Sequence, residues 1–144
     1  MRALLQRVSS ARVEVAGEVV GSIDRGLLVL LGVAREDSVA EAERLARRTL
    51  ELRIFPDDDK PMNRSLVDVD GGLLVVSQFT LCADTRRGRR PGFSTAAPPE
   101  QAQPIYEHFV ACCRDAGVTT TTGRFGADMQ VHLVNDGPVT LLLD

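Results

Sequence analysis

The chain has 144 residues, of which 44% are hydrophobic and 26% charged, so one folded domain spanning residues 1–144 is expected and a disordered chain is excluded. The formal net charge of −3 and the 4% aromatic content, without tryptophan, argue against a general DNA-binding or single-strand-binding protein, so any RNA contact must come from a local basic patch. Because no stretch reaches the roughly 18 apolar residues of a membrane helix and the first residues lack the features of a signal peptide, we expect a cytoplasmic protein without membrane contact.

The first third of the chain is predicted to form β-strands. Ala11, Val13 and Val15 alternate with charged residues, which is the period-two pattern of a half-buried strand. A turn at residues 16–18 then leads into a second, short strand. Residues 27–33 form a continuous apolar run bounded by glycine and charged residues, which is typical of a buried strand.

A helix is predicted next. Ser38 and Glu41 match a capping box, in which a hydroxyl and a carboxylate satisfy free backbone amides at the start of a helix. Apolar residues recur at helical spacing as far as about Glu51, and a short strand is expected at residues 52–55. Three consecutive aspartates follow at residues 57–59. Because neighbouring carboxylates point apart, we expect a solvated turn there rather than a metal site.

The middle of the chain is predicted to contain a β-hairpin and a second helix. Two apolar runs, at residues 66–69 and 72–76, flank an Asp-Gly pair at residues 70–71, which is a common hairpin turn. The second helix is expected to start near residues 98–100, where proline is tolerated in the first turn, and to stop at Gly117.

Three further strands are predicted toward the carboxyl end, at residues 118–122, 129–133 and 139–143, from β-branched content and alternation. The order of elements is therefore strands, helix, strands, helix, strands. This order predicts a single α+β domain with a curved, mainly antiparallel sheet and two principal flanking helices.

The three cysteines and two histidines indicate neither a disulfide framework nor a metal site. Cys82 is isolated, and the adjacent Cys112 and Cys113 are interpreted as small core residues of the second helix. His108 and His132 do not form an H-x-x-x-H pair, so a histidine-based triad or a zinc site is not expected. We expect no metal and no cofactor.

Two segments place polar or unusual residues where the surroundings are apolar. Ser77-Gln78-Phe79-Thr80 follows a buried strand, so its polar groups must find partners or line a cavity. Simple capping of the strand end is the alternative interpretation. The second segment, Asn-Asp-Gly-Pro-Val-Thr at residues 135–140, has a Gly-Pro step between apolar runs, which by itself is usually a plain turn.

A third segment is a dense basic run. Four arginines occur within five residues, at Arg86, Arg87, Arg89 and Arg90. Guanidinium groups bind phosphate oxygens in a forked geometry, which indicates a phosphate-binding loop. A solvated charged loop is the alternative, and composition leaves both interpretations open.

Together these segments resemble the D-aminoacyl-tRNA deacylase family. The matching stretches are Ser77-Gln78-Phe79-Thr80-Leu81, the segment 135–140, Gln6-Arg7-Val8, the Arg-Pro-x-Phe of residues 90–93, and Gly123-x-Phe125-Gly126-Ala127-x-Met129. They run in order from the first strand to the last, so the resemblance covers essentially the whole chain. Family members often carry serine where Gly92 stands, so no hydroxyl role is assigned at that position.

The resemblance implies a barrel-like core and a homodimeric editing hydrolase that cleaves the ester of D-aminoacyl-tRNA, and of glycyl-tRNA, while leaving L-aminoacyl-tRNA intact. By the same resemblance, Gly137 and Pro138 form a cis peptide that enters the active site of the other subunit, supported by Arg7 and Asn135. D and L forms carry identical groups, so counting hydrogen bonds cannot separate them. A rigid wall of backbone carbonyls that collides with an L side chain can.

The resemblance also suggests that the RNA takes part in catalysis, with the 2′-OH of the terminal adenosine helping to activate water or the ester. Ser77 and Gln78 would shape the floor of the pocket, and a backbone N–H at Phe79 or Thr80 would face the developing oxyanion. The resemblance places an adenosine pocket at Phe125 and Met129. It places the contacts to tRNA phosphates on the basic run, at Arg86, Arg87, Arg89 and Arg90. A plain core role for Phe125 and Met129 stays open.

Other functions also stay open. One is a protein-based esterase with Thr80 as its nucleophile, although a hydroxyl nucleophile normally needs an adjacent base and both histidines lie outside these segments. A second is a non-catalytic RNA-binding module that uses the basic run. A third is a structural protein whose arginines contact an acidic partner.

Overall fold

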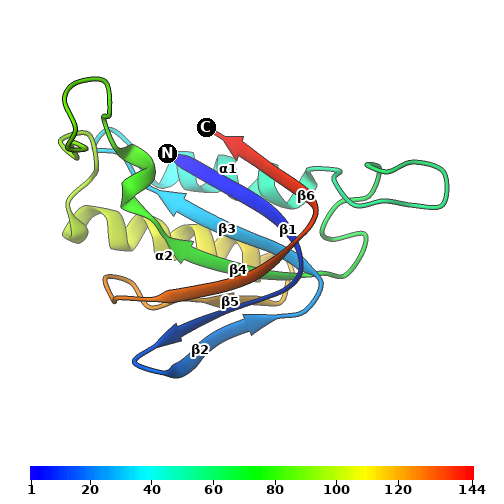
Figure 1. The fold of residues 1–144 in the computed structure, drawn as a ribbon. Helices are drawn as coiled ribbons and strands as arrows, with labels where there is room; N and C mark the ends of the chain where they lie inside the picture. The colour runs from blue at the N-terminus through cyan, green and yellow to red at the C-terminus, as the bar shows by residue number, and fades with distance from the viewer.

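A strongly curved sheet carries two helices on one of its faces in the computed structural model, which describes residues 1–144 (Figure 1). The elements follow along the chain as β1 (Arg2–Val15), β2 (Glu18–Ile23), β3 (Gly26–Gly32), α1 (Val39–Glu51), β4 (Gly72–Ser77), the 3-10 helix η1 (Phe79–Cys82), α2 (Pro99–Asp115), β5 (Thr120–Thr122) and β6 (Gln130–Leu143). The α+β domain with two flanking helices is therefore confirmed.

Strand β1 organises the sheet because its 14 residues are enough to pair with three other strands. Its first half pairs antiparallel with β3, its second half pairs antiparallel with β2, and β6 runs antiparallel along its other edge. The β3–β4 and β4–β5 pairs are parallel. The sheet is thus mainly antiparallel, as predicted, with two parallel pairs that place the carboxyl ends of β3 and β4 side by side.

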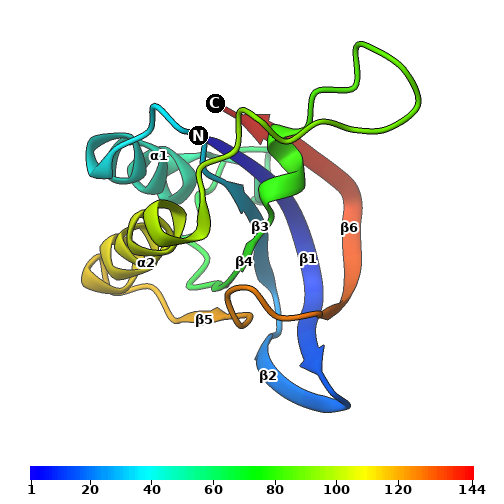
Figure 2. The ribbon, with the colours of Figure 1, turned by 90° about the vertical axis from the view of Figure 1, so that its left-hand side faces the viewer.

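The curvature brings β2 close to β5, so the sheet nearly closes into a barrel (Figure 2). Gly21 of β2 faces the backbone of β5, where an added Cβ would lie 2.3 Å from the carbonyl oxygen of Thr122. Only glycine permits this approach. The hydroxyl of Thr121 also donates to the carbonyl oxygen of Ser22 at 3.4 Å.

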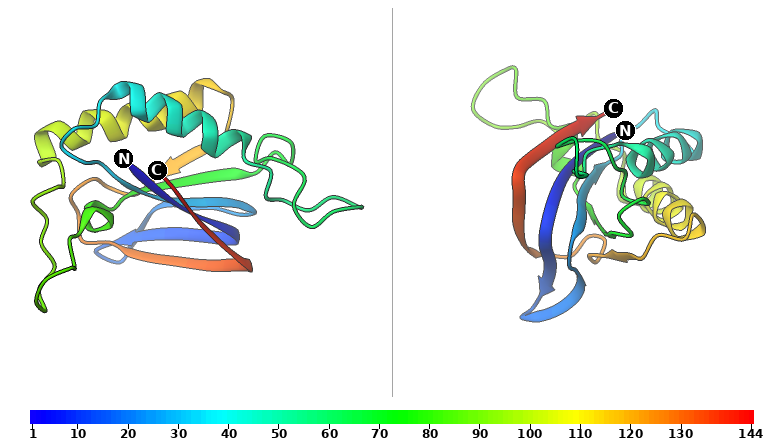
Figure 3. Two further views of the ribbon diagram at one scale, coloured as in Figure 1. Left: turned by 90° about the horizontal axis from the view of Figure 1, so that it is seen from above. Right: turned by 90° about the vertical axis from the view of Figure 1, so that its right-hand side faces the viewer.

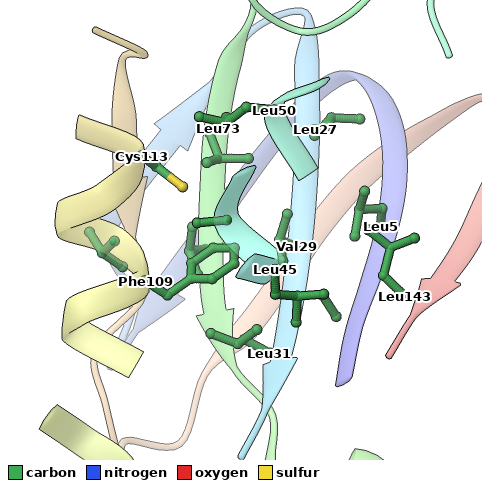
Figure 4. Packing of buried hydrophobic residues seen from close by; sticks show 14 of the residues in the cluster. Leu5, Leu27, Val29, Leu31, Leu45, Leu50, Leu73, Phe109, Cys113 and Leu143 are labelled. Atoms are coloured by element: carbon green, nitrogen blue, oxygen red, sulfur yellow. The ribbon is translucent and has the colours of Figure 1, made fainter. Parts of the chain in front are cut away.

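The two helices lie next to each other on one face of the sheet, and the core fills the space between them and the strands (Figures 2, 3 and 4). The predicted capping box is present, since the Ser38 N–H donates to Glu41 Oε2 at 2.9 Å. Phe109 and Cys113 of α2 point from the helix into this core (Figure 4). Cys113 is fully buried, which raises the pKa of its thiol to about 12, whereas Cys112 is only half-buried. Neither helix has the length and apolar character needed to cross a bilayer.

Two predicted strands are absent. Residues 52–55 join another segment only through one isolated bridge, between Phe55 and Arg64. Residues 66–70 form turns instead of the first arm of a hairpin, because Ser65 and Asp68 each accept a hydrogen bond from the other's backbone N–H, at 3.2 and 2.8 Å. These local bonds compete with strand pairing, and β4 pairs in parallel with β3 instead.

Two loops extend from opposite ends of the molecule (Figure 3). The loop after α1, residues 56–64, contains the acidic triplet, and the Asp57 carboxylate accepts hydrogen bonds from the backbone of Asp59 and Lys60 at 2.9 and 2.7 Å. This is the turn that the sequence predicts. The other loop, residues 85–91, carries the basic run and lies between η1 and α2.

Candidate active site

The polar segment at the end of β4 leaves the sheet where two parallel strands end together. Ser77 is the last residue of β4, and the backbone N–H of Gln78 donates to the carbonyl oxygen of Leu31 on β3 at 2.8 Å. The chain then turns through η1, which starts at Phe79. Ser77 and Gln78 are half-buried, while Phe79 and Thr80 are exposed.

A cavity of about 560 Å³ opens beside this segment, and Ser77, Gln78 and Phe79 form part of its wall. Twelve of its 18 lining residues are hydrophobic. Its polar side chains come from Arg35, Ser77 and Gln78 only. An apolar cavity with a few convergent polar groups is typical of a site for a small organic ligand.

The cavity lining also includes Phe125 and Met129, for which the sequence predicts either an adenosine pocket or a core role. Both are half-buried, so they contact the core and still face the cavity. The ring of Phe125 rests on Tyr106, with ring centroids 5.7 Å apart. The Tyr106 hydroxyl donates to the carbonyl oxygen of Val75 at 2.9 Å. Burial raises the pKa of Tyr106 to about 12, so its hydroxyl keeps its proton and holds this wall in place.

Thr80 does not line the cavity. Its hydroxyl accepts a hydrogen bond from the side-chain amide of Gln78, which is not a base. Neither histidine lines the cavity either: His108 lies 2.9 Å from Glu43, and His132 lies 3.3 Å from Glu14. The structure therefore shows no base–hydroxyl pair of the kind that activates a protein nucleophile.

The Gly-Pro step lies within a single strand and not in a turn between two strands, so the plain-turn interpretation is wrong. β6 continues through it, but the pairing with β1 shifts: Gln6 pairs with Thr140, and Val8 pairs with Asn135. Four residues of β6 thus stand opposite the single residue Arg7, and β6 forms a bulge there. The Gly137–Pro138 bond is cis, and both residues are exposed.

Arg7 and Asn135 hold this bulge through hydrogen bonds, and both are predicted from the sequence as supporting residues. Arg7 Nε donates to the carbonyl oxygen of Asp136 at 3.1 Å, and Nη1 donates to the carbonyl oxygen of Ile54 at 2.7 Å. Asn135 bridges the bulge, because its amide nitrogen donates to the Thr140 hydroxyl at 2.8 Å and its oxygen accepts from the Val139 N–H at 3.2 Å. The bulge is therefore anchored on both sides, yet neither Gly137 nor Pro138 lines the cavity of its own chain.

The basic run stands on a loop that is closed at its base by a bridge between Asp84 and Gly92 (Figure 2). Arg86 folds back and donates to Asp84 at 2.9 and 2.8 Å. This pair holds the pKa of the Asp84 carboxyl well below its usual range and raises the pKa of Arg86. The other arginines of the loop make no ion pair and are fully available to an anionic partner: Arg87, Arg89 and Arg90.

Two further residues at the mouth of the cavity were not singled out in the sequence as separate site residues. Arg35 lines the cavity, and its Nε donates to the carbonyl oxygen of Ser94 at 2.6 Å. Phe93 lines it too and contacts Phe79. Arg35 lies two residues after the buried run 27–33. Its position in the sequence could have identified it, because parallel strands bring their carboxyl ends together at one edge of a sheet.

Comparisons with known proteins agree along the whole chain. A family model described as D-Tyr-tRNA(Tyr) deacylase matches residues 4–144. A D-aminoacyl-tRNA deacylase of Pseudomonas aeruginosa (strain LESB58) is 63% identical over 144 residues, which cover 100% of this chain and 99% of the relative. A protein of the same name from Jannaschia sp. (strain CCS1) is 60% identical, with 100% and 98% covered.

Two solved structures are also similar. One, described as c-Myc DNA Unwinding Element Binding Protein, has 42% identity and a TM-score of 0.94, and the match covers 100% of this chain and 98% of that chain. The other, described as a probable eukaryotic D-amino acid tRNA deacylase, has 18% identity and a TM-score of 0.85 over 99% and 97% of the two chains. The second likeness concerns the fold alone.

Proposed function

This chain belongs to the D-Tyr-tRNA(Tyr) deacylase family, and on that premise we propose how its cavity removes a wrongly handed amino acid from tRNA. The protein is a hydrolase that acts on aminoacyl-tRNA and a D-aminoacyl-tRNA deacylase, as its relatives at 60–63% identity over their full length are. The observation that carries the finer proposal is the cavity beside Ser77, Gln78 and Phe79, which is large enough for an amino acid on a terminal adenosine. Since its substrate is charged tRNA, we assign the protein to the cytoplasm.

The adenine ring occupies the wall formed by Phe125 and Met129. An apolar ring and a polarisable thioether offer a sequence-tolerant surface to a nucleobase. The ester then lies toward Ser77 and Gln78, at the start of η1. The first N–H groups of a helix have no partner inside the helix, so Phe79 or Thr80 supplies a backbone donor for the oxyanion. One such donor contributes about 10²–10³ in rate.

Rejection of L-aminoacyl esters is assigned to Gly137 and Pro138 of a second subunit. They lie on an exposed bulge that Arg7 and Asn135 hold in place, although neither residue lines the cavity beside Ser77 in its own chain. A second copy supplies the missing cavity, so we propose a homodimer in which each bulge closes the other subunit's site. Exposed apolar side chains on the same strand support a subunit contact there: Val134, Leu141 and Leu142.

The backbone carbonyls of the bulge occupy the space that an L side chain would need. Every 1.4 kcal/mol of unfavourable contact lowers the binding of an L-aminoacyl ester tenfold. Glycine has no Cβ, so glycyl-tRNA enters as well. The arginines that face solvent on the loop 85–91 bind tRNA phosphates, because guanidinium groups match phosphate geometry.

The chemical step is assigned to the 2′-OH of the terminal adenosine rather than to Thr80. Thr80 does not line the cavity, and the only side-chain partner of its hydroxyl is an amide. We expect Thr80→Ala to retain hydrolysis of D-tyrosyl-tRNA, while wild-type protein loses most of its activity on a tRNA that ends in 2′-deoxyadenosine. The reverse pattern, loss with Thr80→Ala and full activity on the deoxy substrate, would establish the protein nucleophile.

The function itself is tested by incubating purified protein with D-tyrosyl-tRNA and L-tyrosyl-tRNA and measuring ester loss. We expect hydrolysis of the D ester alone. Binding of both without hydrolysis would contradict the assignment and favour an RNA-binding module.

A further inference from the structure

Two aromatic side chains that line the cavity are also exposed to solvent. Phe79 is 54% exposed and Phe93 is 36% exposed, although the chain has only five phenylalanines and no tryptophan. Their ring centroids are 5.0 Å apart and their planes meet at 67°. Both residues line the cavity, so this pair, the aromatic lip, is continuous with the site.

The lip is built from two separate segments that are fixed independently. Phe79 opens η1, directly after the polar segment at the end of β4. Phe93 follows the Asp84–Gly92 bridge that closes the arginine loop, and its carbonyl oxygen accepts from the Ala96 N–H at 3.1 Å. The two rings meet outside the hydrophobic core, and neither belongs to a core cluster. Their contact therefore serves the surface of the cavity rather than the packing of the fold.

The surroundings of the lip are cationic. Arg35 lies on the cavity wall, uses Nε on the carbonyl oxygen of Ser94 next to Phe93, and makes no ion pair. The unpaired arginines of the loop 85–91 begin just before Phe93 in the chain. Exposed rings flanked by unpaired guanidinium groups form the arrangement that binds a single-stranded nucleic acid: rings for the bases and cations for the backbone.

We propose that the aromatic lip stacks the base of the nucleotide that precedes the terminal adenosine, and that Arg35 binds the phosphate that joins the two nucleotides. This inference rests on the proposed function, since it takes the terminal adenosine to fill the cavity. The strand then leaves the cavity across the lip and continues toward the arginine loop. The protein thereby reads the single-stranded end of its substrate over two nucleotides.

The size of the effect follows from base stacking. Truncation of a stacking ring weakens binding by about 5- to 150-fold per base. The wild-type kcat/KM should therefore be higher by about that factor for 3′-D-tyrosyl-cytidylyl-adenosine than for 3′-D-tyrosyl-adenosine, which lacks the preceding nucleotide. The ratio of the two constants measures the lip together with Arg35 and cancels any effect on the cavity itself.

The variants Phe93→Leu and Phe93→Tyr separate stacking from apolar bulk. Leucine fills the space without a ring, so Phe93→Leu should lower the ratio to the part that Arg35 contributes, whereas Phe93→Tyr should keep the wild-type ratio. A dinucleotide ester that lacks its first base but keeps the joining phosphate should have a smaller kcat/KM gain over 3′-D-tyrosyl-adenosine. The gain that remains comes from Arg35, so Arg35→Gln should remove it. Wild-type hydrolysis of both esters with an unchanged ratio in Phe93→Leu would overturn the lip and leave the proposed function intact.

Failure of wild-type protein on both esters would instead refute the function on which the inference rests. Sedimentation of Phe93→Leu provides the remaining control. We expect the same sedimentation coefficient as the wild type. A shift to a smaller species would show that Phe93 is a subunit contact and would overturn the assignment to a nucleotide base.

Discussion

Substitution of Gly137 by alanine tests the bulge at the place where its backbone is most constrained. Gly137 has a φ of +129°, which L side chains rarely adopt. A Cβ built there would lie 2.9 Å from Cγ2 of Val139 and 3.1 Å from Nη2 of Arg7. Val139 is buried and has little room to move, so the new methyl group pushes either the bulge outward or the Arg7 guanidinium aside.

The structure gives the magnitude in two parts. A residue held in a sparsely populated backbone region costs about 1–3 kcal/mol. Displacement of Arg7 also weakens its bond to the Asp136 carbonyl oxygen, and a hydrogen bond to a charged group contributes about 1.5–3 kcal/mol. A shift of the wall that relieves only 1.4 kcal/mol of its contact with an L side chain raises L hydrolysis about tenfold.

The assay is the ratio of kcat/KM for D-tyrosyl-tRNA and L-tyrosyl-tRNA, with urea unfolding measured alongside. Gly117→Ala is a matched control, because Gly117 also has a positive φ, +84°, but a Cβ there meets nothing within 4 Å and the residue lies beyond α2, away from the cavity. We expect both variants to lose stability and only Gly137→Ala to lose discrimination. An unchanged D-over-L ratio in Gly137→Ala would refute the role of the bulge.

Three further outcomes are expected. Arg7→Lys should lower the D-over-L ratio, because a lysine ammonium lacks the planar fork that reaches the carbonyl oxygens of both Asp136 and Ile54; an unaltered ratio would contradict this. Arg89→Ala should raise KM for tRNA more than Arg86→Ala and should flatten its salt dependence, because Arg86 is already paired with Asp84; equal effects would argue against phosphate binding by the loop. Tyr106→Phe should cost about 0.5–1.5 kcal/mol in urea unfolding at neutral pH, since the hydroxyl bond to Val75 is lost. Burial raises the pKa of Tyr106 to about 12, so the folded state keeps a proton that the unfolded state releases near pH 10. The free energy of unfolding should therefore fall between pH 10 and 12, and it should fall less in Tyr106→Phe. An identical alkaline profile in the variant and the wild type would contradict this.

Local patterns in the sequence predicted the elements whose stability is itself local or periodic. The capping box at Ser38 starts α1, and the helix-stopping Gly117 follows α2, as expected. The hairpin at residues 66–76 failed because Ser65 and Asp68 satisfy each other's backbone, and periodicity in a short apolar run does not reveal such bonds.

The part of the site whose residues are neighbours in the sequence could be predicted. Ser77, Gln78 and Phe79 follow an apolar strand, and their polarity pointed to a cavity. The support of the bulge was less accessible, because Arg7 reaches the carbonyl oxygens of Ile54 and Asp136, which are groups that every residue carries and that no sequence pattern marks. The pairing of β1 with β6 brings Arg7 and Asp136 together, and the segment after α1 adds Ile54.

The claim that one subunit's bulge closes the other's cavity is tested most directly with mixed dimers. One subunit would carry Ala127→Trp, which fills its cavity with a large ring, and the other would carry Gly137→Ala. In the mixed dimer, the open cavity then faces an intact bulge, so we predict hydrolysis of D-tyrosyl-tRNA with wild-type discrimination, although neither parent has it. Activity that equals the sum of the two parent variants, with discrimination still lost, would contradict closure by the partner.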